Sequence, residues 1–81
     1  MTDAPNPREF IDRCKAAGER AYDAMYEARN DYDVGWQKEL AVDAYRDAYR
    51  TAQEAGLEEE AAELMKRILH IKGVARQLRS S

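Results

Sequence analysis

The chain has 81 residues, of which 44% are hydrophobic and 36% are charged, and its formal net charge is -3. This balance is too apolar for a disordered tail and too charged for a membrane protein, so it favours one small domain with a single hydrophobic core. Cys14 is the only cysteine, which excludes an intramolecular disulfide and the CxxC motifs of metal and redox sites.

Residues 1–5 are expected to form a short disordered lead, followed by a single domain over residues 6–81. The first ten residues lack the basic start and the apolar run of a signal peptide. No apolar run approaches the ~20 residues needed to span a bilayer. We therefore expect a cytoplasmic protein without membrane contact.

The first helix is predicted over residues 7–30. Asn6 is suited to cap it, Pro7 suits its first position, and Glu9 is placed to complete a capping box. Apolar residues then recur at steps of three and four, as on one face of a helix. They are Phe10, Cys14, Ala17, Ala21, Met25, Ala28 and Tyr32. Gly18 lies within this pattern, and because the periodicity continues past it, we expect an unbroken helix.

The second helix is predicted over residues 34–55. A cluster of turn-forming residues between positions 30 and 35 marks the end of the first helix, and Asp33 is the expected N-cap of the second. The apolar face of this helix is dominated by alanine and tyrosine. It comprises Trp36, Leu40, Ala41, Ala44, Tyr45, Ala48, Tyr49, Ala52 and Ala55.

The third helix is predicted over residues 57–79, after a left-handed Gly56 that ends the second. Its apolar residues step by four and three along one seam. The seam consists of Leu57, Ala61, Leu64, Ile68, Ile71, Ala75 and Leu78. So short a connection makes the second and third helices an antiparallel hairpin. We therefore predict an all-α protein, an up-down-up antiparallel three-helix bundle.

The second helix resembles the second helix of a tetratricopeptide repeat, because Ala41 is followed by Tyr45 four positions on and by Ala48 three further. Traces of the same pattern occur at Tyr32, Gly35, Gly56, Ala61 and Met65. The chain length and the alanine-aromatic packing are also similar to the three-helix microtubule-interacting-and-trafficking domain. Both resemblances cover roughly residues 25–69, and they imply a peptide-binding scaffold and not an enzyme.

Further apolar residues lie beside the main helix faces. They are Ile11, Tyr22, Tyr26, Val42, Tyr49, Ala62, Met65 and Leu69. In one interpretation, the tyrosines cover the rim of the bundle and keep their hydroxyls in water. In the other, these side chains line a groove for an amphipathic helix of a partner or for a second copy of the chain, and arginines attract acidic partners. The candidate partner-binding residues are Tyr22, Tyr26, Tyr49, Met65, Leu69, Arg67 and Arg76.

The C-terminal helix is basic, since residues 61–81 carry 5 Lys/Arg against 1 Asp/Glu, whereas residues 1–60 carry 8 against 15. A small nucleic-acid-binding or regulatory protein that uses this helix is therefore the alternative function, and a purely structural oligomer is a third. His70 has no histidine or cysteine three or four positions away, so no metal site is predicted. Cys14 is interpreted as a small buried apolar residue. No nucleophile with its base, phosphate loop or cofactor fingerprint is present, so neither catalysis nor a cofactor is predicted.

Overall fold

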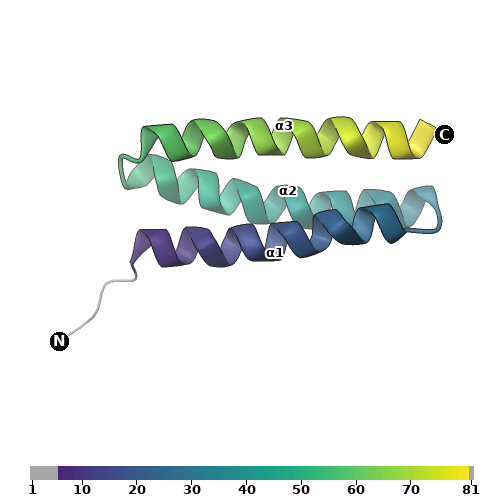
Figure 1. Cartoon of the computed structure of the whole chain (residues 1–81), viewed down its shortest axis with the longest axis horizontal. Coiled ribbons are helices and arrows are strands. Elements are labelled where there is room, and N and C mark those ends of the chain that lie inside the picture. The colour runs from purple at the N-terminus through teal and green to yellow at the C-terminus, as the bar shows by residue number, and fades with distance from the viewer. Residues whose placement is uncertain (1–5, 81) are drawn as a thin grey trace.

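The computed structural model describes residues 6–80 of the chain. Over this range three helices run up, down and up, and Figure 1 shows them aligned along one axis: α1 (Pro7–Glu27), α2 (Asp31–Glu54) and α3 (Glu58–Ser80). The predicted all-α three-helix bundle is thus confirmed. The lead predicted over residues 1–5 lies outside the described residues.

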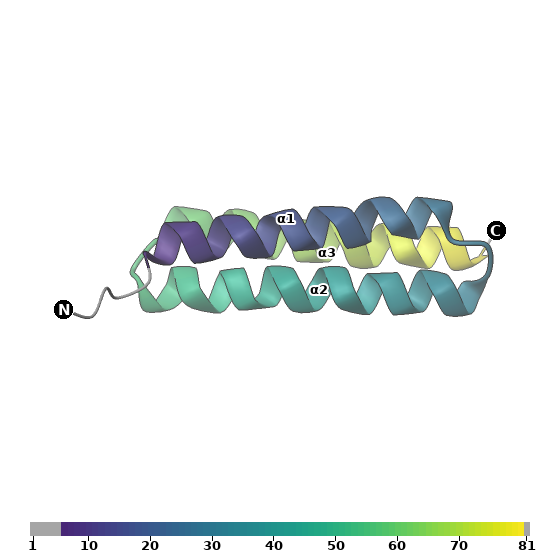
Figure 2. The ribbon, with the colours of Figure 1, turned by 90° about the horizontal axis from the view of Figure 1, so that it is seen from below.

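The central helix of the bundle is α2. Both α1 and α3 pack along it, whereas the backbones of α1 and α3 approach each other little. Figure 1 shows α2 between the other two helices, and Figure 2, turned by 90°, shows it beneath both of them. One face of α2 is therefore covered by two helices, and α3 has one flank that faces α1 and one that does not.

The core lies along the two contacts of α2. Three alanines on α2, Ala41, Ala48 and Ala52, are completely buried and let the neighbouring helices come close, and larger side chains from α1 and α3 fill the remaining space. The buried apolar residues are Ile11, Ala21, Met25, Val34, Ala41, Val42, Tyr45, Ala48, Ala52, Ala61, Leu64, Ile68, Ile71 and Ala75. The predicted seam of α3 is confirmed in its five central residues, and its two ends, Leu57 and Leu78, are half-buried.

The closest approach between α1 and α2 occurs where Gly18 meets the ring of Tyr45. A Cβ atom added at Gly18 would lie 2.4 Å from Cε2 and 2.6 Å from Cδ2 of Tyr45. The helix continues through Gly18, as predicted, because the lost helix propensity is offset by room for a buried aromatic ring.

The predicted face of α1 is wrong in its first turn. Phe10 is 41% exposed, whereas Ile11, which was assigned to a flank, is only 1% exposed. The buried residues of α1 are Ile11, Gly18, Ala21 and Met25, so the predicted face is confirmed at Ala21 and Met25, and the core-facing side is turned toward Ile11 and Gly18. Cys14 is half-buried beside these residues.

The turn between α1 and α2 also differs from the prediction. Helix α1 ends at Glu27, and Asn30, not Asp33, caps α2: the Asn30 side-chain oxygen accepts a hydrogen bond from the Asp33 backbone N–H at 2.8 Å. Helix α2 therefore begins three residues early. As a result Tyr32, expected on the face of the first helix, lies in the first turn of α2 and is exposed.

Two further side chains of α2 are misassigned. Trp36 and Leu40 were placed on its apolar face, but both are exposed. The predicted Ala41, Tyr45, Ala48 and Ala52 are buried, Val34 and Val42 join them, and Trp36 lies on the side of the helix that α1 and α3 leave uncovered. Alternating small and large apolar residues around most of the helix made this face ambiguous in the sequence.

The turn between α2 and α3 forms as predicted. Gly56 has φ +75°, its N–H donates to the Gln53 carbonyl at 3.1 Å, and the Leu57 N–H donates to the Ala52 carbonyl at 2.8 Å. This pair of bonds is a Schellman motif, which requires a left-handed residue at the glycine position. The turn brings α3 back antiparallel to α2.

Candidate functional site

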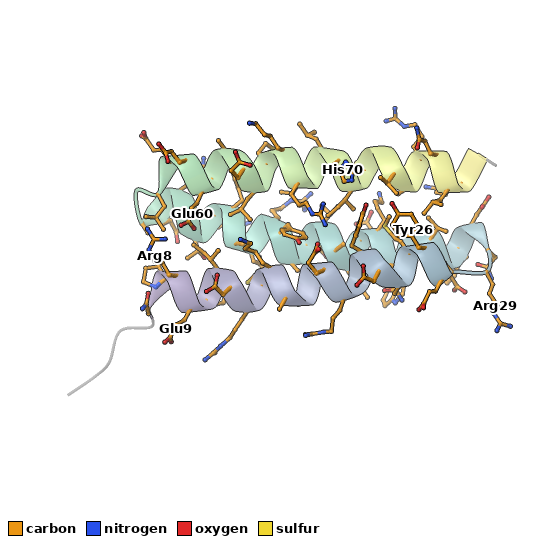
Figure 3. The ribbon with its side chains drawn as sticks, viewed as in Figure 1. Arg8, Glu9, Tyr26, Arg29, Glu60 and His70 are labelled. Carbon is orange, nitrogen blue, oxygen red and sulfur yellow. The ribbon has the colours of Figure 1, made fainter. Side chains whose placement is uncertain are left out.

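A cluster of aromatic side chains connects α1 to α3. The Tyr22 hydroxyl lies 2.9 Å from the Tyr26 hydroxyl and 3.1 Å from Nε2 of His70, and the two tyrosine rings meet edge to face at 5.3 Å. The Arg67 guanidinium lies 4.5 Å from the centre of the Tyr22 ring. Figure 3 shows Tyr26 on α1 and His70 on α3 along the same side of the bundle. Three of the predicted site residues, Tyr22, Tyr26 and Arg67, are therefore close together.

Arg67 is also part of a hydrogen-bonded bridge over the core. The hydroxyl of Tyr45 donates to Oε2 of Glu19 at 2.6 Å, and the Arg67 guanidinium donates to the same oxygen. The hydrogen bonds from Tyr45 and then Arg67 lower the pKa of Glu19, while burial, followed by the bond to Glu19, raises the pKa of Tyr45 to about 12. The charge of Arg67 is thus balanced by Glu19, and the bridge ties α1, α2 and α3 together.

Beside this bridge is a hollow of about 780 Å³ between α1 and α3. Its polar lining is mostly acidic, with Lys15 and Arg67 as the cations. The carboxylates are Asp12, Glu19, Glu59, Glu60 and Glu63. Glu60 is bound to Arg8, and Figure 3 shows these two residues facing each other across the start of α1 and α3. We call this hollow the acidic groove.

The other flank of α3 carries a second group of predicted residues. Tyr49 of α2 and the exposed Met65 and Leu69 of α3 line a hollow of about 290 Å³, which has the buried Ile68 at its base. A second hollow of about 530 Å³ continues along the same two helices and shares Tyr49 and Met65 with the first. We call the two hollows together the α2–α3 groove, and Tyr49, Met65 and Leu69 its apolar strip.

The α2–α3 groove continues toward the C-terminal end of α3 into a hollow of about 550 Å³ with a basic lining. We include this third hollow in the α2–α3 groove and call it the cationic end; its cations are Lys38, Lys72, Arg76 and Arg79. Lys72 also lines the neighbouring hollow beside Leu69, so the two regions are continuous. Arg76, the last of the predicted site residues, therefore lies on the same side of α3 as the apolar strip.

The seven predicted residues thus fall on two surfaces. Tyr22, Tyr26 and Arg67 lie between α1 and α3, and the remaining four lie along the α2–α3 groove. The prediction from sequence missed the basic rim that α2 adds to this groove, namely Lys38, Arg46 and Arg50. The four-residue spacing of Arg46 and Arg50 on α2, like that of Lys72 and Arg76 on α3, was visible in the sequence, but their alignment depends on the register between the helices.

Two other features bear on chemistry. Burial, and to a lesser extent Asp47, raises the pKa of the Cys14 thiol, which disfavours the reactive thiolate. Within residues 6–80, no three His, Cys, Asp or Glu side chains gather where they could hold a metal ion.

Among the helices of residues 6–80, none combines the length and the apolar character needed to cross a membrane.

Neither a protein-family model, nor a curated protein, nor a solved structure matches this chain.

Proposed function

We propose that this protein is a protein-interaction module that binds a helical segment of a partner in the α2–α3 groove. The observation that carries the proposal is the apolar strip: Leu69 is 60% exposed and Met65 36% exposed, side by side with the half-buried Tyr49. Large apolar side chains gathered in a groove are characteristic of binding surfaces, whereas single ones are common on any surface.

The groove is suited to a helix because of its shape. Met65 and Leu69 are four residues apart, so they form one ridge along α3. The other flank of α3 is bridged to α1 by side chains, but along residues 6–80 no helix covers the flank with Met65 and Leu69. A partner helix with apolar residues at i, i+3, i+4 and i+7 would pack there as one helix packs on another.

The expected affinity is modest. Burying the exposed parts contributes about 1–2 kcal/mol for Leu69, which is 60% exposed, and about 0.5–1 kcal/mol for Met65, which is 36% exposed. Part of this gain is offset by the cost of immobilising the partner. The module is therefore expected to bind transiently.

The resemblance noted in the sequence supports the same class of function. The pattern of Ala41, Tyr45 and Ala48 lies fully within the helix contacts, with each side chain 2% exposed or less. The resemblance to tetratricopeptide repeats and to the microtubule-interacting-and-trafficking domain implies a peptide-binding scaffold. The reduced cysteine, Cys14, is compatible with the cytoplasmic setting that we propose for the interaction.

Nucleic-acid binding is the second candidate function. It is favoured by the cationic end, where Lys38 of α2 joins Lys72, Arg76 and Arg79 of α3. The apolar strip that continues this basic surface contributes little to binding a phosphate backbone. A protein ligand accounts for both parts of the groove, and we therefore prefer it.

A library of displayed amphipathic helices, selected on the wild-type protein, tests the proposal. The affinities of the selected helices are then measured on Leu69→Ser and on the matched control Leu40→Ser, because Leu40 is also exposed but lines none of the three hollows of the groove. Leu69→Ser is expected to weaken binding about five- to thirtyfold, as the loss of about 1–2 kcal/mol implies, and Leu40→Ser should leave it unchanged.

Two results would contradict the proposal. One is equal binding of the selected helices to wild type and Leu69→Ser. The other is a wild-type protein that sediments as a dimer while Leu69→Ser is a monomer, because the groove would then be occupied by a second copy of the chain.

A further inference from the structure

The charge along the α2–α3 groove is uneven. Six cations line its hollows: Lys38, Arg46, Arg50, Lys72, Arg76 and Arg79. The carboxylates that line the same hollows are Asp31 and Glu58, which lie toward opposite ends. Among the residues that line the groove, cations therefore outnumber carboxylates, although Lys38 pairs with Glu39 and Arg46 with Asp43 beside it, and although the whole chain has a net charge of -3.

A carboxylate on α2 lies beside these cations. Glu39 on α2 pairs with Lys38 at 2.9 Å, and the bond and charge of Lys38 lower its pKa, with smaller contributions from Arg46 and Lys72. Cations from both helices thus act on one point near the groove. A ligand with negative charge on its flanks would meet the same field.

The positive charge is concentrated at one end of the apolar strip. Beyond Leu69, in the direction of the α3 C-terminus, the groove is lined by the cationic end. In the opposite direction, beyond Met65, the hollow is lined by Glu58 and by uncharged residues apart from it. A bound helix therefore meets four cations and one carboxylate, Asp31, at one end, and a carboxylate without a lining cation, Glu58, at the other.

This polarity distinguishes the two directions in which a helix can lie in the groove. A helix carries partial negative charge at its C-terminus and partial positive charge at its N-terminus. The C-terminus is favoured next to the cationic end, and the N-terminus next to Glu58. Both ends therefore favour the same direction, which is parallel to α3.

We propose that the occupant of the α2–α3 groove is an acidic amphipathic helix of a partner protein that lies parallel to α3, with its acidic C-terminal half over Lys38, Lys72, Arg76 and Arg79. This inference rests on the proposed function, and it adds the charge and the direction of the partner. The apolar strip contacts the apolar face of the helix, and the flanking cations contact its carboxylates.

Three synthetic peptides test the inference. Each has about 20 residues, because Glu58 and Arg79 are separated by roughly 32 Å along α3 at 1.5 Å per residue, and each has the same apolar face. The first carries glutamates in its C-terminal half, the second carries them in its N-terminal half, and the third carries lysines in place of the glutamates of the first. Hydrocarbon staples equalise their helicity, which circular dichroism verifies before the affinities are measured.

The first peptide should bind best. Several exposed ion pairs of modest strength add up to about a tenfold advantage over the lysine peptide, and this advantage should shrink with added salt. The advantage over the second peptide should be a few-fold. A nitroxide label at the C-terminus of the first peptide should broaden the backbone NMR signals near Arg79 and leave those near Glu58 sharp.

Charge reversals in the protein test the same inference, one pair in the groove and a matched control pair on α1. Lys72→Glu combined with Arg76→Glu should weaken the first peptide and strengthen the lysine peptide. Arg13→Glu combined with Arg20→Glu changes the net charge equally, but on exposed positions of α1, and should leave the order of affinities as it is in the wild type.

The outcomes separate this inference from the proposed function. If all three peptides bind equally and Leu69→Ser weakens them all, the groove binds helices but the inferred charge and direction are wrong. If none of them binds, the proposed function and the inference both fail. If a single-stranded RNA oligonucleotide binds more tightly than the first peptide and Leu69→Ser has no effect on it, the basic surface serves nucleic acid and the inference is overturned.

Discussion

Replacing Gly18 by alanine tests the contact on which the packing of α1 against α2 depends. In an open part of a helix this substitution stabilises by about 1 kcal/mol, because alanine has the higher helix propensity. At Gly18 the new Cβ would stand 2.4 Å from Cε2 of Tyr45, and the Tyr45 side chain is only 2% exposed. The ring cannot simply turn into water, so we expect the substitution to destabilise the protein.

The size of the effect follows from two costs. Overpacking a filled core costs about 1–3 kcal/mol. Displacing the ring also strains the 2.6 Å hydrogen bond between the Tyr45 hydroxyl and Glu19, and such a bond contributes about 1 kcal/mol. After the gain of about 1 kcal/mol in helix propensity is subtracted, Gly18→Ala should lower the free energy of unfolding by about 1–3 kcal/mol, which corresponds to a fall in Tm of roughly 4–24 °C for a domain of this size.

Gly73 provides the matched control. It lies in the interior of α3, is exposed, and has no atom within 4 Å of the position that a Cβ would take. Gly73→Ala should therefore raise the free energy of unfolding by about 0.5–1 kcal/mol. Urea and thermal unfolding, followed by circular dichroism, measure both variants. If Gly18→Ala were as stabilising as Gly73→Ala, the close approach of α1 to Tyr45 would be refuted.

Two further predictions concern the turn between α1 and α2 and the bridge formed by Tyr45, Glu19 and Arg67. Asn30→Ala should lower the free energy of unfolding in urea by about 1 kcal/mol, because the Asn30 side chain caps α2. Asp33→Ala should lower it by only about 0.3–1 kcal/mol, since Asp33 acts through the helix dipole. A larger loss of stability for Asp33→Ala than for Asn30→Ala would contradict the assigned cap. Because Tyr45 and Arg67 lower the pKa of Glu19, the ionised carboxylate stabilises the fold at neutral pH, and this contribution is lost as the pH falls from the ordinary carboxyl value of about 4.3 through the lowered pKa. The stability advantage of the wild type over Glu19→Gln should therefore shrink between neutral and acidic pH in thermal melts, and parallel pH profiles for the two proteins would contradict the bridge.

The helices themselves could be predicted from local patterns. The seam of α3 through Leu64, Ile68 and Ile71 is buried as the steps of four and three required, because a helix that buries one side must repeat its apolar residues at the helical period. Gly56 ends α2 in a left-handed conformation for an equally local reason, since glycine adopts it without strain. These features depend on residues that are neighbours in sequence.

The boundary of α2 and the buried face of α1 were harder to predict. Asn30 and Asp33 are both good capping residues, and only the actual path of the turn decides which of them binds a free backbone N–H. Phe10 and Ile11 are both apolar and lie 100° apart on the helix, so the packing of α1 on Tyr45 through Gly18 decides which of them is buried.

The tertiary structure decides which neighbours each part of the candidate site has. Met65 and Arg67 are two residues apart and lie on opposite flanks of α3, a separation that the helical period already implies. The helical period does not tell which flank of α3 faces α1. That choice, made by long-range packing of α1 against α2, joins Arg67 to Glu19 and leaves Met65 beside an uncovered groove.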